Sequence, residues 1–317
     1  MDRRAFIGCL AIPLSTVTQA ARKVPRIGVL RWGTPDDGSQ ARLREALGAK
    51  GYREGRNIAI AWRWATRNED AARHATQLVQ SGVDVIVAAP TPAAHAARDA
   101  TRTVPIVLAG VADPVRSGLV SSLARPGGNI TGVSFNFPAV TGKLVQLLKE
   151  TLPDVTQIAF LAATGDPAAQ LFIDEIQSAA QRAGLRVQVV SIDRADEFED
   201  AFSIMARERA QAVIIQPLFT PHARVLAELS QRHRLPLIAP FPSFVRADGL
   251  MSYGPSSAAI TERTVVYVEK ILDGAKPGDL PIEEPTRFEF LVNLKTAGAF
   301  GITIPRSVLL RADEVIQ

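Results

Sequence analysis

One stretch, residues 83–116, constrains the fold of this chain more than any other. It begins with a β-branched run at 83–87 that is typical of a strand buried on both faces, and the run stops at two prolines. Residues 93–101 then predict a helix capped by Thr91, with a proline in the first turn, where a missing N–H costs nothing. Residues 104–109 predict a second buried strand that ends at a turn. Successive strand ends therefore open onto helix N-termini, and in an open parallel sheet this edge is where ligands bind.

Strands and helices alternate in the same way along most of the chain, in two successive series. The first series predicts strands at residues 27–30, 57–64, 83–87, 104–109 and 130–137, with helices at 39–50, 70–80, 93–101 and 114–123. The second predicts strands at 157–162, 186–192, 212–216 and 237–241, with helices at 141–151, 167–183, 196–209 and 221–233. After residues 250–255 come a helix at 256–272 and a last strand at 287–292. Two βαβ series predict an α/β fold with two parallel sheets.

A chain of 317 residues is long for one hydrophobic core, so we expect two lobes. The first lobe is predicted to consist of residues 26–137 and 252–284, and the second of residues 138–251 and 285–317. This division makes the chain cross between the lobes three times. Closure about three hinge strands is an ordinary motion for two domains around a ligand.

Residues 1–21 have the pattern of an export signal. Two arginines precede an apolar segment at 5–17, and small residues follow, with cleavage expected after Ala20 or Ala21. The apolar run is shorter than the roughly 20 residues that a membrane span needs. The run RRAFI is similar to a twin-arginine motif, and a general secretory signal that begins with two arginines by chance fits equally well. We therefore expect a periplasmic location, by either export route.

Cys9 is the single cysteine of the chain. Gly8-Cys9 is similar to a lipoprotein cleavage site, but almost no apolar segment precedes it, so we expect no lipid anchor on Cys9. Once the signal is removed, the chain has no thiol. This excludes disulfides, thiolate metal sites and cysteine nucleophiles.

Charge and motif content argue against several classes of function. The 36 basic and 32 acidic residues are interspersed and give a net charge of only +4, so we expect no nucleic-acid partner. None of the four histidines lies in a metal-binding spacing, and no nucleophile elbow, dinucleotide fingerprint or phosphate-binding loop occurs. We expect no catalytic residue, no metal and no cofactor, and we interpret His95 as a packing or solvent-facing residue.

Eight segments, spread from one end of the chain to the other, carry a resemblance to a known family: RRAFIG, RIGVLRWGTPDD, GYREGRNIAIAWRWA, VDVIVAAPTPAAHAA, TVPIVLAGVADPVRSGLVSSLARPGGNITGVS, LMSYGP, YVEKILDGAKPGDLPIEEPTRFEFLVNLKTAGAFGITIP and LLRADEVIQ. Through them the chain resembles the family of ABC-transporter substrate-binding proteins that includes tryptophan- and tyrosine-binding lipoproteins. The resemblance implies a type I periplasmic-binding fold, with two α/β lobes, three connecting strands and a small ligand trapped between the lobes. It also implies delivery of that ligand to the membrane subunits of an ABC permease. We expect the protein to be a monomer.

The strand-end rule gives the candidate ligand-binding residues. In the first lobe they are Trp32, Gly33, Pro90, Thr91, Ala93, Asp113 and Asn136; in the second they are Thr164, Phe219 and Phe241, with Tyr253 at a crossing between the lobes. For a ligand with a carboxylate, Thr91 and the N–H groups of Ala93 and Ala94 would form an anion cradle. Asp113 would hold an ammonium by a charge-assisted hydrogen bond, and the four aromatic side chains would pack on an apolar part of the ligand.

Structural roles explain some of these residues equally well. Thr91 is also expected as a helix cap and Asp113 as a turn residue before a proline. Phe219 and Phe241 are also expected as hydrophobic anchors of their loops. The sequence Ala88-Ala89-Pro90 lacks the hydroxyl that relatives commonly carry before the Thr-Pro pair, which weakens an anion site.

The sequence thus predicts an exported solute-binding protein that binds reversibly and carries out no covalent chemistry. Its ligand is expected to be an amino acid or another small carboxylate with an apolar group. Two alternatives stay open: a ligand-sensing receptor domain that feeds a signalling partner, and a racemase-like or lyase-like α/β enzyme. A neighbouring gene for a permease or a kinase would separate transport from sensing, and turnover of the ligand would identify an enzyme.

Overall fold

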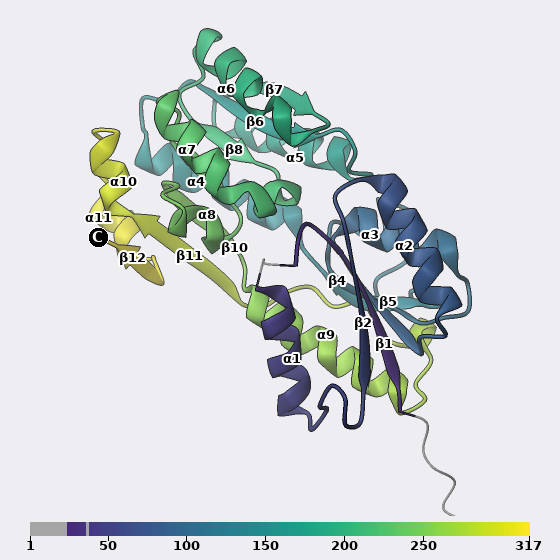
Figure 1. Ribbon diagram of the computed structural model, residues 1–317. Helices are drawn as coiled ribbons and strands as arrows, with labels where there is room; N and C mark the ends of the chain where they lie inside the picture. The colour runs from purple at the N-terminus through teal and green to yellow at the C-terminus, as the bar shows by residue number, and fades with distance from the viewer. Residues whose placement is uncertain (1–23, 36–37) are drawn as a thin grey trace, which may run out of the picture.

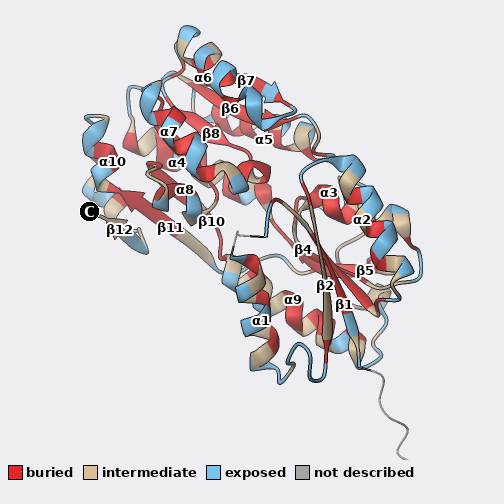
Figure 2. Cartoon of the chain, in the orientation of Figure 1, coloured by how far each residue is buried: buried red, intermediate tan, exposed pale blue. Residues whose placement is uncertain are grey.

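The computed structural model describes residues 24–35 and 38–317 and shows two lobes, each built on its own β-sheet (Figure 1). The predicted export signal at residues 1–21, with its twin-arginine run and Cys9, lies outside the described residues. Helices cover both faces of each sheet, and Figure 2 shows the central strands of both lobes as buried. The predicted α/β fold with two mostly parallel sheets is confirmed.

The first lobe contains a five-stranded sheet with the order β2-β1-β3-β4-β5, in which every neighbouring pair is parallel. Its elements are β1 (Arg26–Trp32), α1 (Ser39–Ala49), β2 (Ala59–Ala65), α2 (Asn68–Gln80), β3 (Val85–Ala89), α3 (Thr91–Ala100), β4 (Ile106–Val111), β5 (Ile130–Ser134) and, from later in the chain, α9 (Ser257–Leu272) and the short 3₁₀ helix η3 (Pro277–Asp279). Alternate strand residues pack against α2 and α3 on one face and against α1 and α9 on the other. Burial on both faces explains the β-branched run in β3.

The second lobe contains a seven-stranded sheet with the order β12-β11-β10-β9-β8-β6-β7. Its elements are α4 (Phe137–Thr151), β6 (Gln157–Ala163), α5 (Ala169–Arg182), β7 (Arg186–Ile192), η1 (Ala195–Glu197), α6 (Phe198–Arg207), β8 (Val213–Ile215), η2 (Pro217–His222), α7 (Ala223–Arg232), β9 (Leu237–Ala239), α8 (Pro242–Arg246), β10 (Met251–Pro255), β11 (Phe288–Asn293), α10 (Leu294–Ala299), α11 (Arg306–Leu309) and β12 (Glu314–Ile316). Strands β10 and β11 are antiparallel, and the other neighbouring pairs are parallel. Helices α4 and α5 pack on one face of this sheet, and α6 and α7 pack on the other.

The chain passes between the two sheets at three places. β5 leads directly into α4 of the second lobe, and β10 leads into α9 of the first. The last passage runs through Glu283, whose N–H donates to Gly132 O at 3.0 Å and whose carbonyl oxygen accepts from Ser134 N at 2.8 Å, and then into β11. Residues 252–255, which the sequence-based division places in the first lobe, pair with β9 and β11 in the second sheet.

One predicted helix is wrong, and two strands of the structure are not predicted. Residues 114–123, predicted as a helix, form turns and bends in which the carbonyl oxygen of Pro114 accepts from the N–H groups of Leu119 and Val120. Gly118 has φ +76°, a left-handed conformation that ends a helical turn. Residues 250–255, where the sequence predicts a crossing between the lobes but no strand, contain β10, and β12 has no counterpart among the predicted strands.

Replacement of Gly254 by alanine should destabilise the second lobe. The added Cβ would lie 2.0 Å from the carbonyl oxygen of Pro240, so one of the two segments must move, and overpacking of this kind costs about 1–3 kcal/mol. Urea unfolding of Gly254→Ala should show that loss. Gly48→Ala in α1, where no atom lies within 4 Å of the added methyl, is the matched control and should be neutral or more stable. Equal stability of the two variants would contradict the close approach.

Candidate functional site

The carboxyl ends of the strands in the two sheets meet, and the loops there contact each other across the lobes (Figure 1). We term this region the lobe junction. Asn68, at the start of α2, donates a hydrogen bond from Nδ2 to the carbonyl oxygen of Gly165 at 2.8 Å. The rings of Phe135, after β5, and Phe241, after β9, have centroids 5.6 Å apart. The lobes are therefore in contact through the strand ends where the sequence predicts the ligand site.

The loop after β1 reaches into the second lobe. Trp32 is half-buried and packs against the apolar cluster of the second lobe that contains Phe219, and Phe241 packs on the same cluster. Gly33 has φ +112°, and a Cβ there would lie 2.8 Å from Cγ of Pro221. Glycine suits both this backbone conformation and this close approach. The structure thus brings four of the candidate residues together at the lobe junction.

Thr91 does not cap α3, which corrects the prediction. Pro90 occupies the N-cap position and has no side-chain hydrogen bond to offer. Thr91 already lies within the first turn and is buried, and its Oγ1 accepts a hydrogen bond from the N–H of Ala112 at 3.1 Å. The hydroxyl therefore links the carboxyl end of β3 to that of β4 instead of returning to its own helix.

The N–H groups left free at the start of α3 are those of Thr91 and Ala93. The N–H of Ala94 donates to the carbonyl oxygen of Pro90 at 3.1 Å, so Ala94 is not available for an anion cradle. Neither Thr91 nor Ala93 donates its N–H to another described residue, as expected for the first turn of a helix. Both residues are buried, so the positive end of this helix dipole is shielded from bulk water.

Asp113 and Asn136 follow β4 and β5 and share a left-handed backbone, with φ 25° and 49°. Aspartate and asparagine adopt this conformation more readily than other residues that carry a Cβ. Asp113 Oδ1 accepts from the N–H of Arg116 at 2.9 Å, so the turn role is present, while Oδ2 lies 3.9 Å from the Arg116 guanidinium. Asn136 is the N-cap of α4 and makes no side-chain capping bond. Both side chains are half-buried, and their contacts with a ligand stay predictions.

Thr164 and Tyr253 make their contacts within the second lobe. Thr164 is exposed, and its Oγ1 donates to the carbonyl oxygen of Ile192 at 3.2 Å. Tyr253 lies in β10 and stacks on Phe288, with ring centroids 5.6 Å apart and an angle of 4° between the rings; it also meets the edge of Phe290. Both of these ring contacts are with β11 of the second lobe.

The second lobe contains a buried polar pair, Asp166 and Gln216, that the sequence does not predict. Asp166 Oδ2 accepts from Gln216 Nε2 at 2.7 Å, and Oδ1 accepts from the N–H of Ala168 at 2.9 Å. Gln216 Oε1 accepts from the N–H of Ala163 at 2.8 Å. Burial raises the pKa of Asp166 to about 6, against the opposing effect of the two hydrogen bonds that it accepts. The Gly-Asp-Pro at 165–167 indicates only a turn, so no sequence signal shows that this acid is buried.

Two features are absent from residues 24–35 and 38–317. Within these ranges, no group of three or more His, Cys, Asp and Glu side chains is placed to hold a metal ion. In the same part of the chain, no helix combines the length and the apolar character that crossing a bilayer requires.

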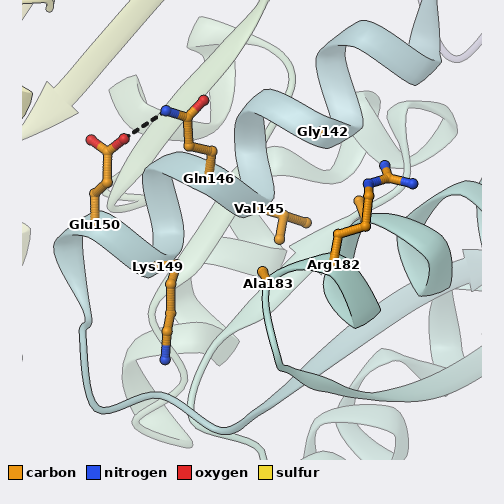
Figure 3. Close-up of a pocket in the computed structure, with 8 residues that line it drawn as sticks. Gly142, Val145, Gln146, Lys149, Glu150, Arg182 and Ala183 are labelled. Carbon is orange, nitrogen blue, oxygen red and sulfur yellow. Dashed lines mark hydrogen bonds between the residues drawn. The ribbon is translucent and has the colours of Figure 1, made fainter.

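A cavity of about 350 Å³ lies away from the lobe junction, between α4 and α5 (Figure 3). It is lined by Gly142, Val145, Gln146, Lys149, Glu150, Ala179, Arg182 and Ala183. Its charged groups already have partners. Lys149 donates to the carbonyl oxygens of Pro153 and Val155, and Glu150 pairs with Arg311. None of the candidate residues lines this cavity, so we do not place the ligand site there.

The architecture defines the class of protein first: two α/β lobes that meet at the carboxyl ends of their strands and are joined by three passages of the chain form a two-lobed binding protein. The family model for ABC transporter substrate binding proteins matches residues 37–316, and the chain belongs to this family. The predicted substrate-binding protein of an ABC transporter, with a type I periplasmic-binding fold, is thereby confirmed.

Three known proteins show the extent of the similarity. A tyrosine-binding protein of Clostridioides difficile (strain R20291) is 27% identical over 260 residues, which cover 81% of this chain and 75% of that protein. The structure of an ABC domain in complex with L-Trp from Streptococcus pneumonia has a TM-score of 0.86 at 27% identity, over 93% of this chain and 100% of the other. The ligand-free, open structure of a substrate binding protein with adhesive properties from Clostridium difficile has a TM-score of 0.66 at 23% identity, over 93% and 99%.

The buried carboxyl of Asp166 should make stability depend on pH. Its pKa in the folded protein, about 6, lies above the ordinary 3.8, so its contribution to folding is fully present below pH 3.8 and is lost as the pH rises through about 6. Asp166→Asn has no such ionisation. The free energy of unfolding of this variant minus that of the wild type should therefore rise by about 2 kcal/mol between pH 4 and pH 7.

Urea unfolding of both proteins across this pH range measures the difference. Asp154→Asn, which changes an exposed carboxylate, is the control and should show a much smaller trend. A difference between Asp166→Asn and wild type that does not change with pH would contradict the raised pKa of Asp166.

Proposed function

We propose that this substrate-binding protein captures an amino acid, or another small carboxylate with an apolar group, at the lobe junction and delivers it to an ABC permease. One observation carries the proposal: N–H groups without a partner and aromatic side chains both occur at the lobe junction. The free N–H groups of α3 suit a carboxylate, and the aromatic side chains from both lobes suit an apolar group.

Each part of an amino acid has a matching group at the lobe junction. Thr91 and Ala93 offer two buried N–H groups at the positive end of α3 to the carboxylate. Asp113 has one oxygen, Oδ2, beyond hydrogen-bond distance of its neighbouring guanidinium, and this oxygen suits an ammonium. Trp32 and Phe241, one from each lobe, pack on the same apolar cluster and would enclose the side group.

The relatives support this class of ligand. One of them is a tyrosine-binding protein, and one of the similar structures is a complex with L-Trp. The TM-score is higher with the L-Trp complex than with the ligand-free, open structure, 0.86 against 0.66, over 93% of this chain in both cases. The difference supports the assignment of the present arrangement of the lobes to a closed state.

Export, assembly and reversibility belong to the same proposal. Residues 1–21 would direct the chain to the periplasm, where the mature protein would act as a monomer and meet the membrane subunits of its permease. Binding would leave the ligand chemically unchanged, so that incubation with the protein returns the same compound. Recovery of an altered compound would favour the enzyme alternative instead.

A screen of thermal stability tests the class of ligand. A compound that binds only the folded protein raises the free energy of unfolding, by about 2.7 kcal/mol at 100 times its Kd. We expect an aromatic or other apolar L-amino acid to raise the melting temperature, whereas glycine and a neutral sugar should leave it unchanged. If no amino acid or small carboxylate raises the melting temperature, the proposed class of ligand is wrong.

Asp113→Asn should weaken the binding of an amino acid more than the binding of the same acid without its amino group. Asparagine keeps an oxygen for the N–H of Arg116, so the turn is preserved while the charge that holds the ammonium is lost. Loss of this charge-assisted hydrogen bond predicts a Kd about 10- to 100-fold higher for the amino acid.

Calorimetry with an amino acid identified in the screen and with its des-amino analogue measures both effects. Asp99→Asn, which changes an exposed carboxylate near the other end of α3, is the matched control and should change neither Kd. Equal weakening of the two ligands by Asp113→Asn would refute a contact between Asp113 and the ammonium.

A further inference from the structure

The hydrogen bond between Asn68 and Gly165 joins the two lobes directly. Asn68 is the first residue of α2 in the first lobe, and Gly165 follows β6 in the second lobe, 97 residues further along the chain. Nδ2 and the carbonyl oxygen are 2.8 Å apart, which is the distance of a well-formed hydrogen bond. Separation of the lobes must break this bond.

The carbonyl of Gly165 points across the lobe junction only while the loop after β6 keeps its shape. Side chains behind the loop hold that shape. Asp166 accepts from the N–H of Ala168 and from Gln216 Nε2, and the Oε1 of Gln216 accepts from the N–H of Ala163. Asp166 and Gln216 are both buried. These three bonds tie both ends of the loop to the end of β8.

The hydrogen bonds of Asp166 explain why a carboxylate stands at this position. Both of its oxygens accept from N–H donors, whereas an asparagine would set an NH₂ group against one of those donors. Burial of a carboxylate without a cationic partner lowers stability. Asp166 therefore contributes the geometry of the loop at some cost in stability.

We propose that Asn68 and Gly165 form a latch that stabilises the closed arrangement before any ligand binds, and that Asp166 and Gln216 are positioning residues that hold the Gly165 carbonyl toward Asn68. The latch is a single hydrogen bond at an exposed side chain. It therefore shifts the equilibrium between open and closed protein toward the closed state but does not prevent opening. This inference does not depend on which compound binds, and it can therefore fail separately from the proposed amino-acid specificity.

Distances between two spin labels in the ligand-free full-length protein test the latch. Cys9→Ser removes the native thiol, and Glu45→Cys in α1 with Asp200→Cys in α6 places one label on an exposed helical position of each lobe. With no further substitution, this protein should show a distance distribution that includes a populated closed state. A distribution that contains only the open state would overturn the proposal.

Asn68→Asp is the most direct test of the latch. The substitution keeps the size of the side chain and places a carboxylate at the start of α2, where the helix dipole favours it. It removes the N–H donor, however, and sets an oxygen against the oxygen of Gly165. The ratio of closed to open protein should fall about fivefold, the factor for loss of one hydrogen bond, while the unfolding midpoint stays the same or rises.

Asn68→Gln, which keeps the donor, should restore part of the closed population. Arg116→Ala, which removes an exposed guanidinium 3.9 Å from Asp174 of the other lobe, is the control for loss of a polar contact between lobes and should change the ratio little. If Asn68→Asp leaves the distance distribution unchanged, the latch does not exist.

A double-mutant cycle separates positioning by Asp166 from general damage to the second lobe. Asp166→Asn alone should lower the closed population because the carbonyl of Gly165 is no longer held in place. In that background, Asn68→Asp should then have no further effect. Fully additive effects of the two substitutions would refute positioning by Asp166. Gln216→Met, which removes the other half of the buried pair, repeats the cycle independently and keeps the test valid if Asp166→Asn does not fold.

Discussion

Neighbouring parallel strands need a long connection between them, usually a helix, and the candidate site depends on this constraint. Each strand therefore ends on one edge of the sheet, at a loop that leads to a helix or, after β4, to the turns at 114–123. In the first lobe the order β1-β3-β4 places three such ends side by side. Trp32, Thr91 and Asp113 come to the same edge in this way, although they are far apart in the sequence. Strand order alone thus gathers an aromatic ring, a helix N-terminus and a carboxylate.

The second lobe supplies the opposing edge, and the contacts between the two edges leave part of the aromatic surface there uncovered. Trp32 and Phe241 are only half-buried where the lobes meet, so a ligand can cover the rest of their surfaces. A ligand shifts an open–closed equilibrium only through its different affinity for the two states. Groups at the lobe junction meet this condition because separation of the lobes would change their surroundings. The cavity between α4 and α5 belongs to one lobe and does not meet it.

The strands are predictable wherever a run of apolar residues is bounded by turn residues, and β7 is found at its predicted bounds, Arg186–Ile192. Prediction fails where a glycine or a proline has a tertiary role. No strand is predicted at β10, since glycine and proline are depleted in strands, but the close approach of the Pro240 carbonyl requires a residue without Cβ at Gly254. At Gly118 a helix is predicted but does not form, because the left-handed backbone of this glycine ends a segment whose composition favours a helix.

The candidate site is predictable as a set of positions but not as a set of contacts, and two carboxylates show why. Asp113 and Asp166 both follow a strand and both precede a proline, so the sequence gives them the same turn role. In the structure, Asp166 is buried and both of its oxygens accept hydrogen bonds from its own lobe. Asp113 is half-buried, and its Oδ2 has no such bond. A carboxylate whose acceptors are all occupied can only hold its loop, whereas one with an acceptor to spare can receive an ammonium. Burial and hydrogen-bond count, which depend on residues distant in sequence, therefore separate the two roles.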